Sequence, residues 1–160
     1  MKGFIRSMAA ACIGCAAFFT SSFCFAQVAV DQIAVGGVGP GCTIAYVEGV
    51  YGQPTASDYV TSDTGVNYIE YNYENHLLVG FQESDSTAVY VTCTSDNLST
   101  PDGVAVGMTA DVLNGKYGQA DHIYNYNDKS LYEYDDENGN CLSFDVQNFY
   151  IVSVNVRAAQ

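Results

Sequence analysis

Residues 41–53 read GCTIAYVEGVYGQ, and 66 residues later (107 − 41) positions 107–119 read GMTADVLNGKYGQ. Six positions are identical in the two stretches: three glycines, a threonine, a tyrosine and a glutamine. An internal repeat predicts two copies of one supersecondary unit, because each copy buries its apolar face against its neighbour. The repeat therefore predicts the architecture before any single residue is considered.

Each copy has the pattern of a short amphipathic helix. Thr43 and Thr109 are expected N-cap residues. Apolar residues then follow at i, i+3 and i+7, which places them on one stripe of a helix: Ile44, Val47 and Tyr51 in the first copy, and Ala110, Leu113 and Tyr117 in the second. Gly52 and Gly118 are expected to end the helices with a positive φ. Because helices of about two turns are marginal alone, both must pack on another element.

Segments rich in β-branched and aromatic residues follow each helix, and short polar turns separate them. They cover residues 66–73, 77–83 and 88–94 after the first helix, and 122–126, 130–134, 140–146 and 150–157 after the second. Each copy is thus a helix followed by an antiparallel meander of three or four strands. The predicted fold class is α+β, with two tandem helix–meander repeats sharing one continuous sheet.

The predicted organisation begins with a secretory signal peptide over residues 1–26. Basic residues precede an apolar run, and a small-x-small cleavage site follows it. The other expected parts are a lead-in segment over 27–37, repeat 1 over 38–93, a linker over 94–103 and repeat 2 over 104–157. Two other interpretations of the leader stay open, an uncleaved membrane anchor and lipidation at Cys12 or Cys15. The leader predicts a secreted, periplasmic or cell-envelope protein.

The chain after the leader is strongly acidic. All 18 acidic residues lie there, against three basic ones (Lys116, Lys129 and Arg157), which gives a formal charge of −15 for residues 27–160. Such a field repels phosphate backbones and anionic lipid, so nucleic-acid binding is excluded. The charge favours solubility outside the cell, and it also fits attraction to a basic partner or to cations.

Three cysteines follow the leader: Cys42, Cys93 and Cys141. In a compartment that permits disulfides they allow three pairings, each of one bridge and one free thiol. Cys42 starts the first helix, and Cys93 lies on an apolar strand that closes the same repeat. We therefore expect a Cys42–Cys93 disulfide, with Cys141 left as a half-buried free thiol in a strand.

Patterns for catalysis and metal binding are weak. His76 and His122 stand outside any nucleophile motif. A Cys–His pair using Cys141 needs a thiolate, which so acidic a surrounding disfavours. The acidic turn over 135–140 superficially resembles a calcium loop but lacks the EF-hand register. We expect no enzyme, no metal site and no cofactor.

Tyrosine is the compositional feature with functional content, since the chain has 13 Tyr and no Trp. Tyr71 and Tyr73, like Tyr124 and Tyr126, are spaced i and i+2 on predicted strands, so each pair shares one sheet face. Tyrosines among Asn, Ser and Gly are typical of binding surfaces, although Tyr also suits a half-buried sheet. If the helices cover one face of the sheet, the other is open. We expect these four tyrosines to bind a protein partner through that open face.

In an exported chain, a tandem pair of helix–meander units, each helix opening with Gly-x-Thr and closing with Tyr-Gly-Gln, resembles the β-lactamase-inhibitor-protein-like superfamily. The likeness spans about residues 38–157. The same unit occurs singly in small outer-membrane assembly lipoproteins of the SmpA/OmlA (BamE) type. The inhibitors carry one disulfide in each repeat, whereas the second repeat here has only Cys141, and the chain has no good lipobox.

The predicted function is therefore that of an exported, non-enzymatic protein-binding module of the cell envelope or extracellular space. The resemblance implies two alternatives: an envelope structural or assembly factor, and an inhibitor of a secreted hydrolase.

Overall fold

The computed structural model of the chain describes residues 27–74 and 76–159. The signal peptide predicted over residues 1–26 lies outside the described residues. A short 3-10 helix, η1 (Val30–Gln32), precedes the helices α1 (Ile44–Tyr51) and α2 (Asp111–Tyr117). The strands are β1 (Ala56–Thr61), β2 (Asn67–Tyr73), β3 (Leu77–Gln82), β4 (Thr87–Cys93), β5 (His122–Tyr126), β6 (Lys129–Asp135), β7 (Cys141–Gln147) and β8 (Tyr150–Arg157).

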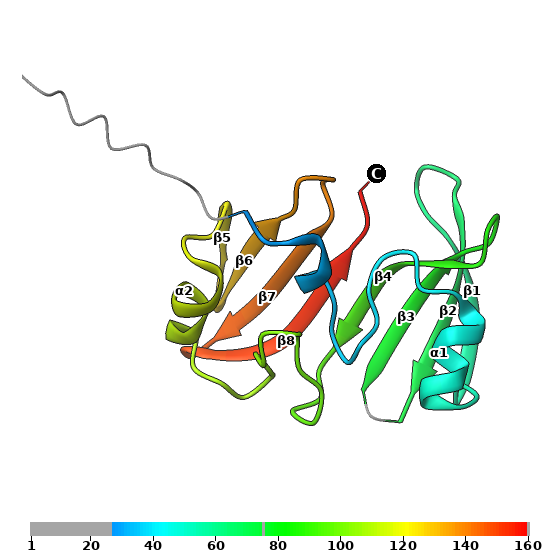
Figure 1. The fold of residues 1–160 in the computed structure, drawn as a ribbon, viewed down its shortest axis with the longest axis horizontal. Coiled ribbons are helices and arrows are strands. Elements are labelled where there is room, and N and C mark those ends of the chain that lie inside the picture. The colour runs from blue at the N-terminus through cyan, green and yellow to red at the C-terminus, as the bar shows by residue number, and fades with distance from the viewer. Residues whose placement is uncertain (1–26, 75, 160) are drawn as a thin grey trace, which may run out of the picture.

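These strands form one eight-stranded antiparallel sheet with the order β1-β2-β3-β4-β8-β7-β6-β5 (Figure 1). Each helix precedes a four-stranded meander, and the two meanders meet where β4 pairs with β8, from Tyr90↔Arg157 to Cys93↔Val154. The α+β class and the continuous sheet predicted from the sequence are therefore confirmed. That the two halves are copies of one unit stays a prediction.

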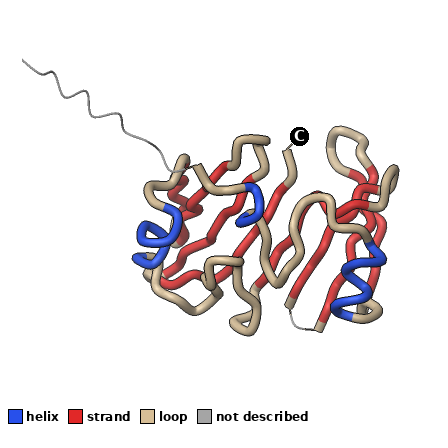
Figure 2. The backbone as a smooth tube through the Cα atoms, viewed as in Figure 1, coloured by secondary structure: helices blue, strands red, loops and turns tan. Residues whose placement is uncertain are grey.

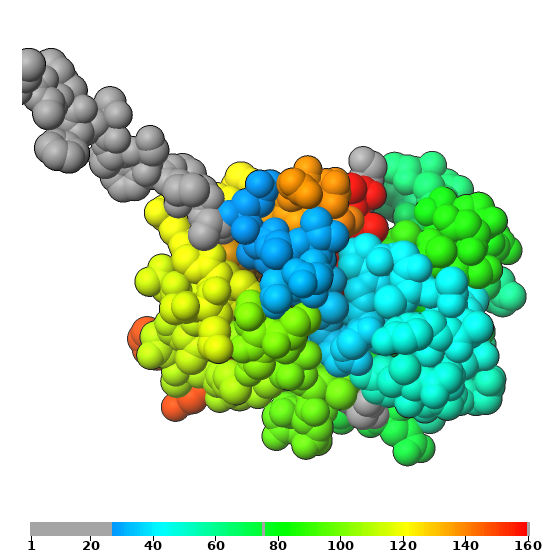
Figure 3. All heavy atoms as spheres, viewed as in Figure 1, coloured from blue at the N-terminus to red at the C-terminus, as the bar shows by residue number. Residues whose placement is uncertain are grey.

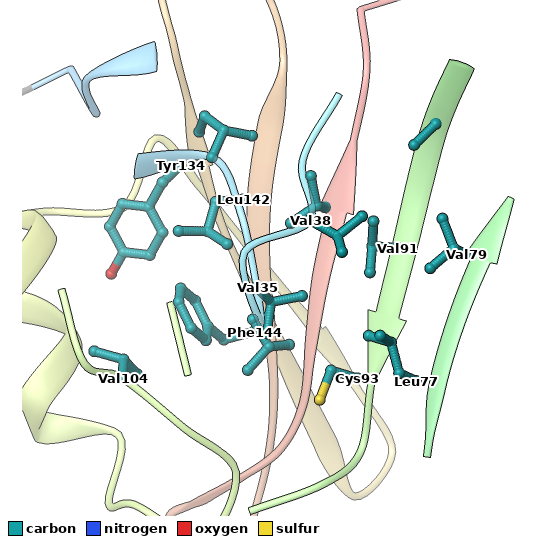
Figure 4. Close-up of a cluster of buried hydrophobic side chains, with 14 of the residues drawn as sticks. Val35, Val38, Leu77, Val79, Val91, Cys93, Val104, Tyr134, Leu142 and Phe144 are labelled. Carbon is teal, nitrogen blue, oxygen red and sulfur yellow. The ribbon is translucent and has the colours of Figure 1, made fainter. Parts of the chain in front are cut away.

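The helices lie over one face of the sheet, together with the N-terminal segment and the connection between β4 and α2 (Figures 1 and 2). Figure 4 shows Val35 and Val38 of the N-terminal segment packed among strand residues such as Val91 and Phe144. Ile33 and Val35, which were expected to belong to a lead-in over 27–37, thus contribute buried side chains to the core. We call this side of the sheet the covered face and the other the open face.

The connection over residues 94–103 is also part of the packed structure. The hydroxyl of Thr100 lies 2.6 Å from that of Tyr117 on α2, and it accepts a hydrogen bond from the backbone of Val104 at 3.1 Å. Thr100 is buried. Polar residues that resemble a linker in sequence therefore hold α2 against the sheet.

The starts of the two helices differ from each other. Thr43 caps α1 as predicted, since its hydroxyl accepts a hydrogen bond from the backbone N–H of Tyr46 at 3.2 Å. The same role for Thr109 was wrong: α2 has Ala110 at its N-cap position, and the Thr109 hydroxyl donates to the Asp111 carboxylate instead. The first copy has Ala45 at the position equivalent to Asp111, so nothing there competes for the threonine.

Seven of the eight strands lie where the sequence predicts them, and β1 was missed. All six residues of β1 are exposed, and β1 is an edge strand that hydrogen-bonds only to β2. A strand without a buried face lacks the alternation of apolar and polar residues by which strands are recognised.

Candidate binding face

Cross-strand register decides which tyrosines point to the open face, since residues directly opposite in an antiparallel pair share a face. Tyr71 lies opposite Val79, and Tyr73 lies opposite Leu77. Both partners are core residues. Tyr73 also packs on Tyr51 of α1, with ring centroids 5.5 Å apart. The structure therefore places Tyr71 and Tyr73 on the covered face, not on the open face where the sequence analysis had put them.

The second predicted pair lies on the open face. Tyr124 is opposite Leu131, and Tyr126 is opposite Lys129. Leu131 lines a hollow in the open face, and both tyrosines are exposed. They stand on β5, the edge strand at the other end of the sheet from β1. The structure thus separates the four predicted tyrosines and brings only this pair to the expected face.

The open face is hollowed over its centre, with a volume of about 920 Å³. Thr92, Ser143 and Asn155 come from the central strands β4, β7 and β8 and share this face by register. Tyr68 and Tyr90 lie toward the first meander, whereas Leu131 and Glu133 lie toward the second. The loop between β1 and β2 adds Ser62, Asp63 and Thr64 to the lining.

Tyr90 is held in place by three neighbours. Its hydroxyl donates to Glu70 Oε1 at 2.5 Å, and its ring meets that of Tyr68 edge-on, with centroids 5.7 Å apart. Its third neighbour is Gly80, directly opposite on β3, whose missing side chain leaves room for the ring. Burial, and then the hydrogen bond to Glu70, raise the pKa of Tyr90, so its phenol stays protonated.

The sequence pattern alone does not single out Tyr68 and Tyr90 as a pair. In the strand predicted over 66–73, Tyr68, Glu70 and Asn72 occupy the positions between the more apolar residues. This alternation is the sequence signal that could have placed Tyr68 on the open face. The Tyr90–Gly80 contact depends on the register between β3 and β4, which shifts at Gly80/Phe81.

Charged groups around the hollow are mainly acidic. Asp63, Glu133 and Asp145 line it, against the single guanidinium of Arg157. Asp145 is fixed, since it accepts hydrogen bonds from Ser153 Oγ at 2.5 Å and from Asn155 Nδ2 at 3.3 Å. A surface of this kind attracts a partner with positive charge.

Cys141 also lines the hollow, and it is buried rather than half-buried, with 2% of its surface exposed. Burial first, and then the carboxylates of Asp135 and Glu133, raise the pKa of its thiol to about 12. The thiol is therefore neutral at physiological pH, and a neutral thiol is a poor nucleophile.

The three cysteines of the described residues are all free, so the expected Cys42–Cys93 disulfide is absent from this structure. The thiol of Cys93 is instead directed at the backbone carbonyl of Ser95, 3.6 Å away. Cys141 is a free thiol in a strand, as predicted.

The other candidate groups lie apart from the hollow. His76 is exposed at the turn between β2 and β3, and His122 is exposed at the start of β5. In the acidic turn, the buried Asp136 carboxylate accepts hydrogen bonds from the backbone of Asn138 and Asn140. No group of three or more His, Cys, Asp or Glu among the described residues is arranged to hold a metal ion. None of the helices in that part of the chain is long and apolar enough to cross a membrane.

Solved structures with a similar fold exist, whereas no protein-family model and no curated protein sequence matches the chain. The uncharacterized protein yfeY from Escherichia coli is similar with a TM-score of 0.50 and 15% identity, over 82% of this chain and 99% of that one. An extracellular protein containing a SCP domain from Bacillus anthracis has a TM-score of 0.49 and 11% identity, over 82% of this chain and 46% of that one.

A putative β-lactamase inhibitor protein from Streptococcus mutans is also similar, with a TM-score of 0.33 and 14% identity, over 78% of this chain and 86% of that one. The likeness to yfeY, at a TM-score of 0.50, supports the fold predicted from the sequence, and the resemblance to the inhibitor superfamily stays a prediction. Identities this low show the fold alone.

Proposed function

We propose that this protein binds a protein partner that covers the open face of its sheet. The observation that carries the proposal is the hollow of about 920 Å³ on a face that neither the helices nor the N-terminal segment covers. A sheet that buries one face in its own core can leave the other free for a second molecule.

The composition of the hollow favours a protein as its occupant. Two tyrosines, two serines, two threonines and an asparagine are among the lining residues, together with four valines. Tyrosine supplies a large contact area for little lost side-chain entropy, and the small polar residues supply adaptable hydrogen bonds. Arginine is enriched where interfaces are strongest, and Arg157 lies opposite Tyr90 at the seam between the meanders.

The negative charge of the hollow and of the whole chain favours a basic partner. The carboxylates of Asp63, Glu133 and Asp145 line the same hollow as Arg157, and residues 27–160 carry a formal charge of −15. Charge complementarity of this kind speeds association and rejects acidic proteins. The leader predicted over residues 1–26 would deliver the protein to the envelope or the extracellular space.

Affinity capture tests the proposal. The full chain, produced in a host that exports it, is immobilised and exposed to the envelope and secreted fractions of its source. Arg157→Ala and Tyr68→Ser alter the hollow. Tyr59→Ser is the matched control, because Tyr59 is 77% exposed on β1 and pairs with Ile69 on the covered side.

We expect one basic protein to be retained by the wild type and by Tyr59→Ser, and its affinity to fall at least about tenfold with Arg157→Ala. If all variants retained the protein equally, the open face would not be the surface that binds the partner. The identity of the retained protein decides between a secreted hydrolase and an envelope component.

A further inference from the structure

Phe149 is the most exposed of the large apolar side chains in the described residues, at 84% of its surface. It lies in the two-residue loop of the β7–β8 hairpin, between the paired residues Gln147 and Tyr150. Both loop residues have a positive φ, 51° at Asn148 and 70° at Phe149. In the space-filling view, atoms coloured for this part of the chain stand out at the left margin (Figure 3).

A two-residue hairpin loop with positive φ at both positions follows the type I′ pattern, for which Asn-Gly is the preferred sequence. Asn148 fits this preference. Phe149 does not, because a side chain with a Cβ is strained at positive φ and glycine is not. The chain thus holds a bulky apolar residue in a strained conformation and in water, which the fold itself does not require.

The loop is fixed by its neighbours. The carbonyl of Phe149 accepts a hydrogen bond from the backbone N–H of Ala110 at 2.9 Å, and Thr109 forms a β-bridge with Tyr150. Gln147 Nε2 donates to Asp128 Oδ2 at 2.5 Å, which ties this hairpin to the β5–β6 hairpin. A side chain presented by a fixed backbone loses less entropy on binding.

Two further exposed aromatic residues of these hairpins lie on the open face. Cross-strand pairs run from Tyr126 through Lys129 and Gln147 to Tyr150, so these residues share that face. Tyr126 and Tyr150 are 61% and 52% exposed. We call Tyr126, Phe149 and Tyr150 the aromatic tip.

We infer that Phe149 is an anchor that enters an apolar pocket, sized for one phenyl ring and rimmed by basic groups, on the partner that covers the open face; this inference rests on the proposed function. Rigid aromatic anchors that fill pockets contribute a large share of binding energy at interfaces. The basic rim follows from charge, since the carboxylates of Asp128 and Asp111 lie beside this hairpin against the single ammonium of Lys129. The chain's acidity argues against an anionic lipid surface and against a second copy of the chain.

The test replaces Phe149 by glycine in the full chain and follows two measurements. Thermal unfolding should shift upward by about 3 °C, because the strain at positive φ is relieved. Isothermal titration with the purified, most enriched protein from the capture should show a Kd about thirty-fold weaker. Phe149→Asn, which also tolerates positive φ, should weaken binding alike. Tyr59→Ser should leave the Kd unchanged.

A Kd that Phe149→Gly leaves unchanged, or a lower unfolding temperature, would overturn the inference. Vesicles of phosphatidylcholine and phosphatidylglycerol are run in parallel, as is sedimentation velocity of the chain alone. Vesicle binding or self-association that Phe149→Gly abolishes would also overturn it, in favour of lipid or of a second copy. If Arg157→Ala abolishes partner binding and Phe149→Gly does not, the proposed function is supported and the role of Phe149 as an anchor is wrong. The reverse result would keep the anchor and remove the hollow from the interface.

Discussion

Gly80 and Tyr90 lie opposite each other on β3 and β4, and the ring of Tyr90 occupies the space that a side chain at position 80 would need. A Cβ built on Gly80 would lie 2.1 Å from Cζ of Tyr90, closer than real contacts allow. The glycine thus lets the ring lie across the sheet, where its hydroxyl reaches Glu70. One wall of the hollow depends on this pair.

Gly80→Ala should therefore displace Tyr90 and break its hydrogen bond to Glu70. We expect the free energy of unfolding to fall by about 1–3 kcal/mol, as for other overpacked sites, and partner affinity to fall with it. Urea unfolding measures the change. Gly49→Ala is the matched control, because a Cβ there meets nothing within 4 Å. Gly49 lies inside α1, so this change should stabilise by up to about 1 kcal/mol. Equal effects at both glycines would contradict the packing described.

The two threonines at the helix starts give a second prediction. Thr43→Ala removes the hydroxyl that accepts from the backbone of Tyr46, and it should cost about 1 kcal/mol of stability. Thr109→Ala should cost less than about 0.5 kcal/mol, because an exposed hydroxyl that bonds only Asp111 does not cap α2. The pair is compared by urea unfolding, and similar losses at both sites would mean that Thr109 caps its helix after all.

The sequence predicts the helix stripes well because burial and helical spacing coincide there: Val47, Leu113 and Tyr117 are all buried. The faces of the tyrosines were harder to predict. Spacing of i and i+2 shows that Tyr71 and Tyr73 share a face, but not which one, since that depends on pairing with β3.

The contact between Tyr68 and Tyr90, which form one wall of the hollow, was equally hard to predict from the sequence. These residues stand on strands β2 and β4, with β3 between them, so their contact depends on two registers and on a bulge. Phe149 was missed for a different reason. Asn-Phe between two strands does not have the usual turn composition, and only the backbone conformation shows that it fills a type I′ loop.

Tyr117 gives a third prediction because it combines packing with a hydrogen bond. Its ring lies 5.3 Å from that of Tyr134 and 5.5 Å from that of Phe144, and its hydroxyl meets Thr100. Tyr117→Ala should cost about 3–5 kcal/mol, as for other large aromatic residues removed from a core. Tyr117→Phe keeps the ring and should cost about 1–2 kcal/mol, since it leaves the buried Thr100 without this partner. Tyr51→Ala, at the equivalent position of α1, should cost less because Tyr51 is only half-buried. Chemical denaturation ranks the three variants.

The last prediction concerns the free energy of unfolding at alkaline pH. The folded state holds the pKa of Cys141 near 12, above the ordinary value of 9.0, and burial is the main cause. Below about pH 9 both states keep this proton, so the contribution of the thiol to stability is fully present. As the pH rises toward 12, the unfolded chain releases the proton first, so the free energy of unfolding falls. Burial raises the pKa of Tyr134 to about 12 in the same direction.

Cys141→Ala should therefore flatten the decline in stability between about pH 9 and 12, measured by urea unfolding at a series of pH values. Cys42→Ala is the control, because Cys42 is half-buried and outside the hollow. Thiol labelling of the native protein at pH 8 checks the same burial: Cys42 should react well before Cys93 and Cys141. Rapid labelling of Cys141, or an unchanged alkaline slope in Cys141→Ala, would mean that water and base reach the floor of the hollow. A partner would then have to exclude them itself.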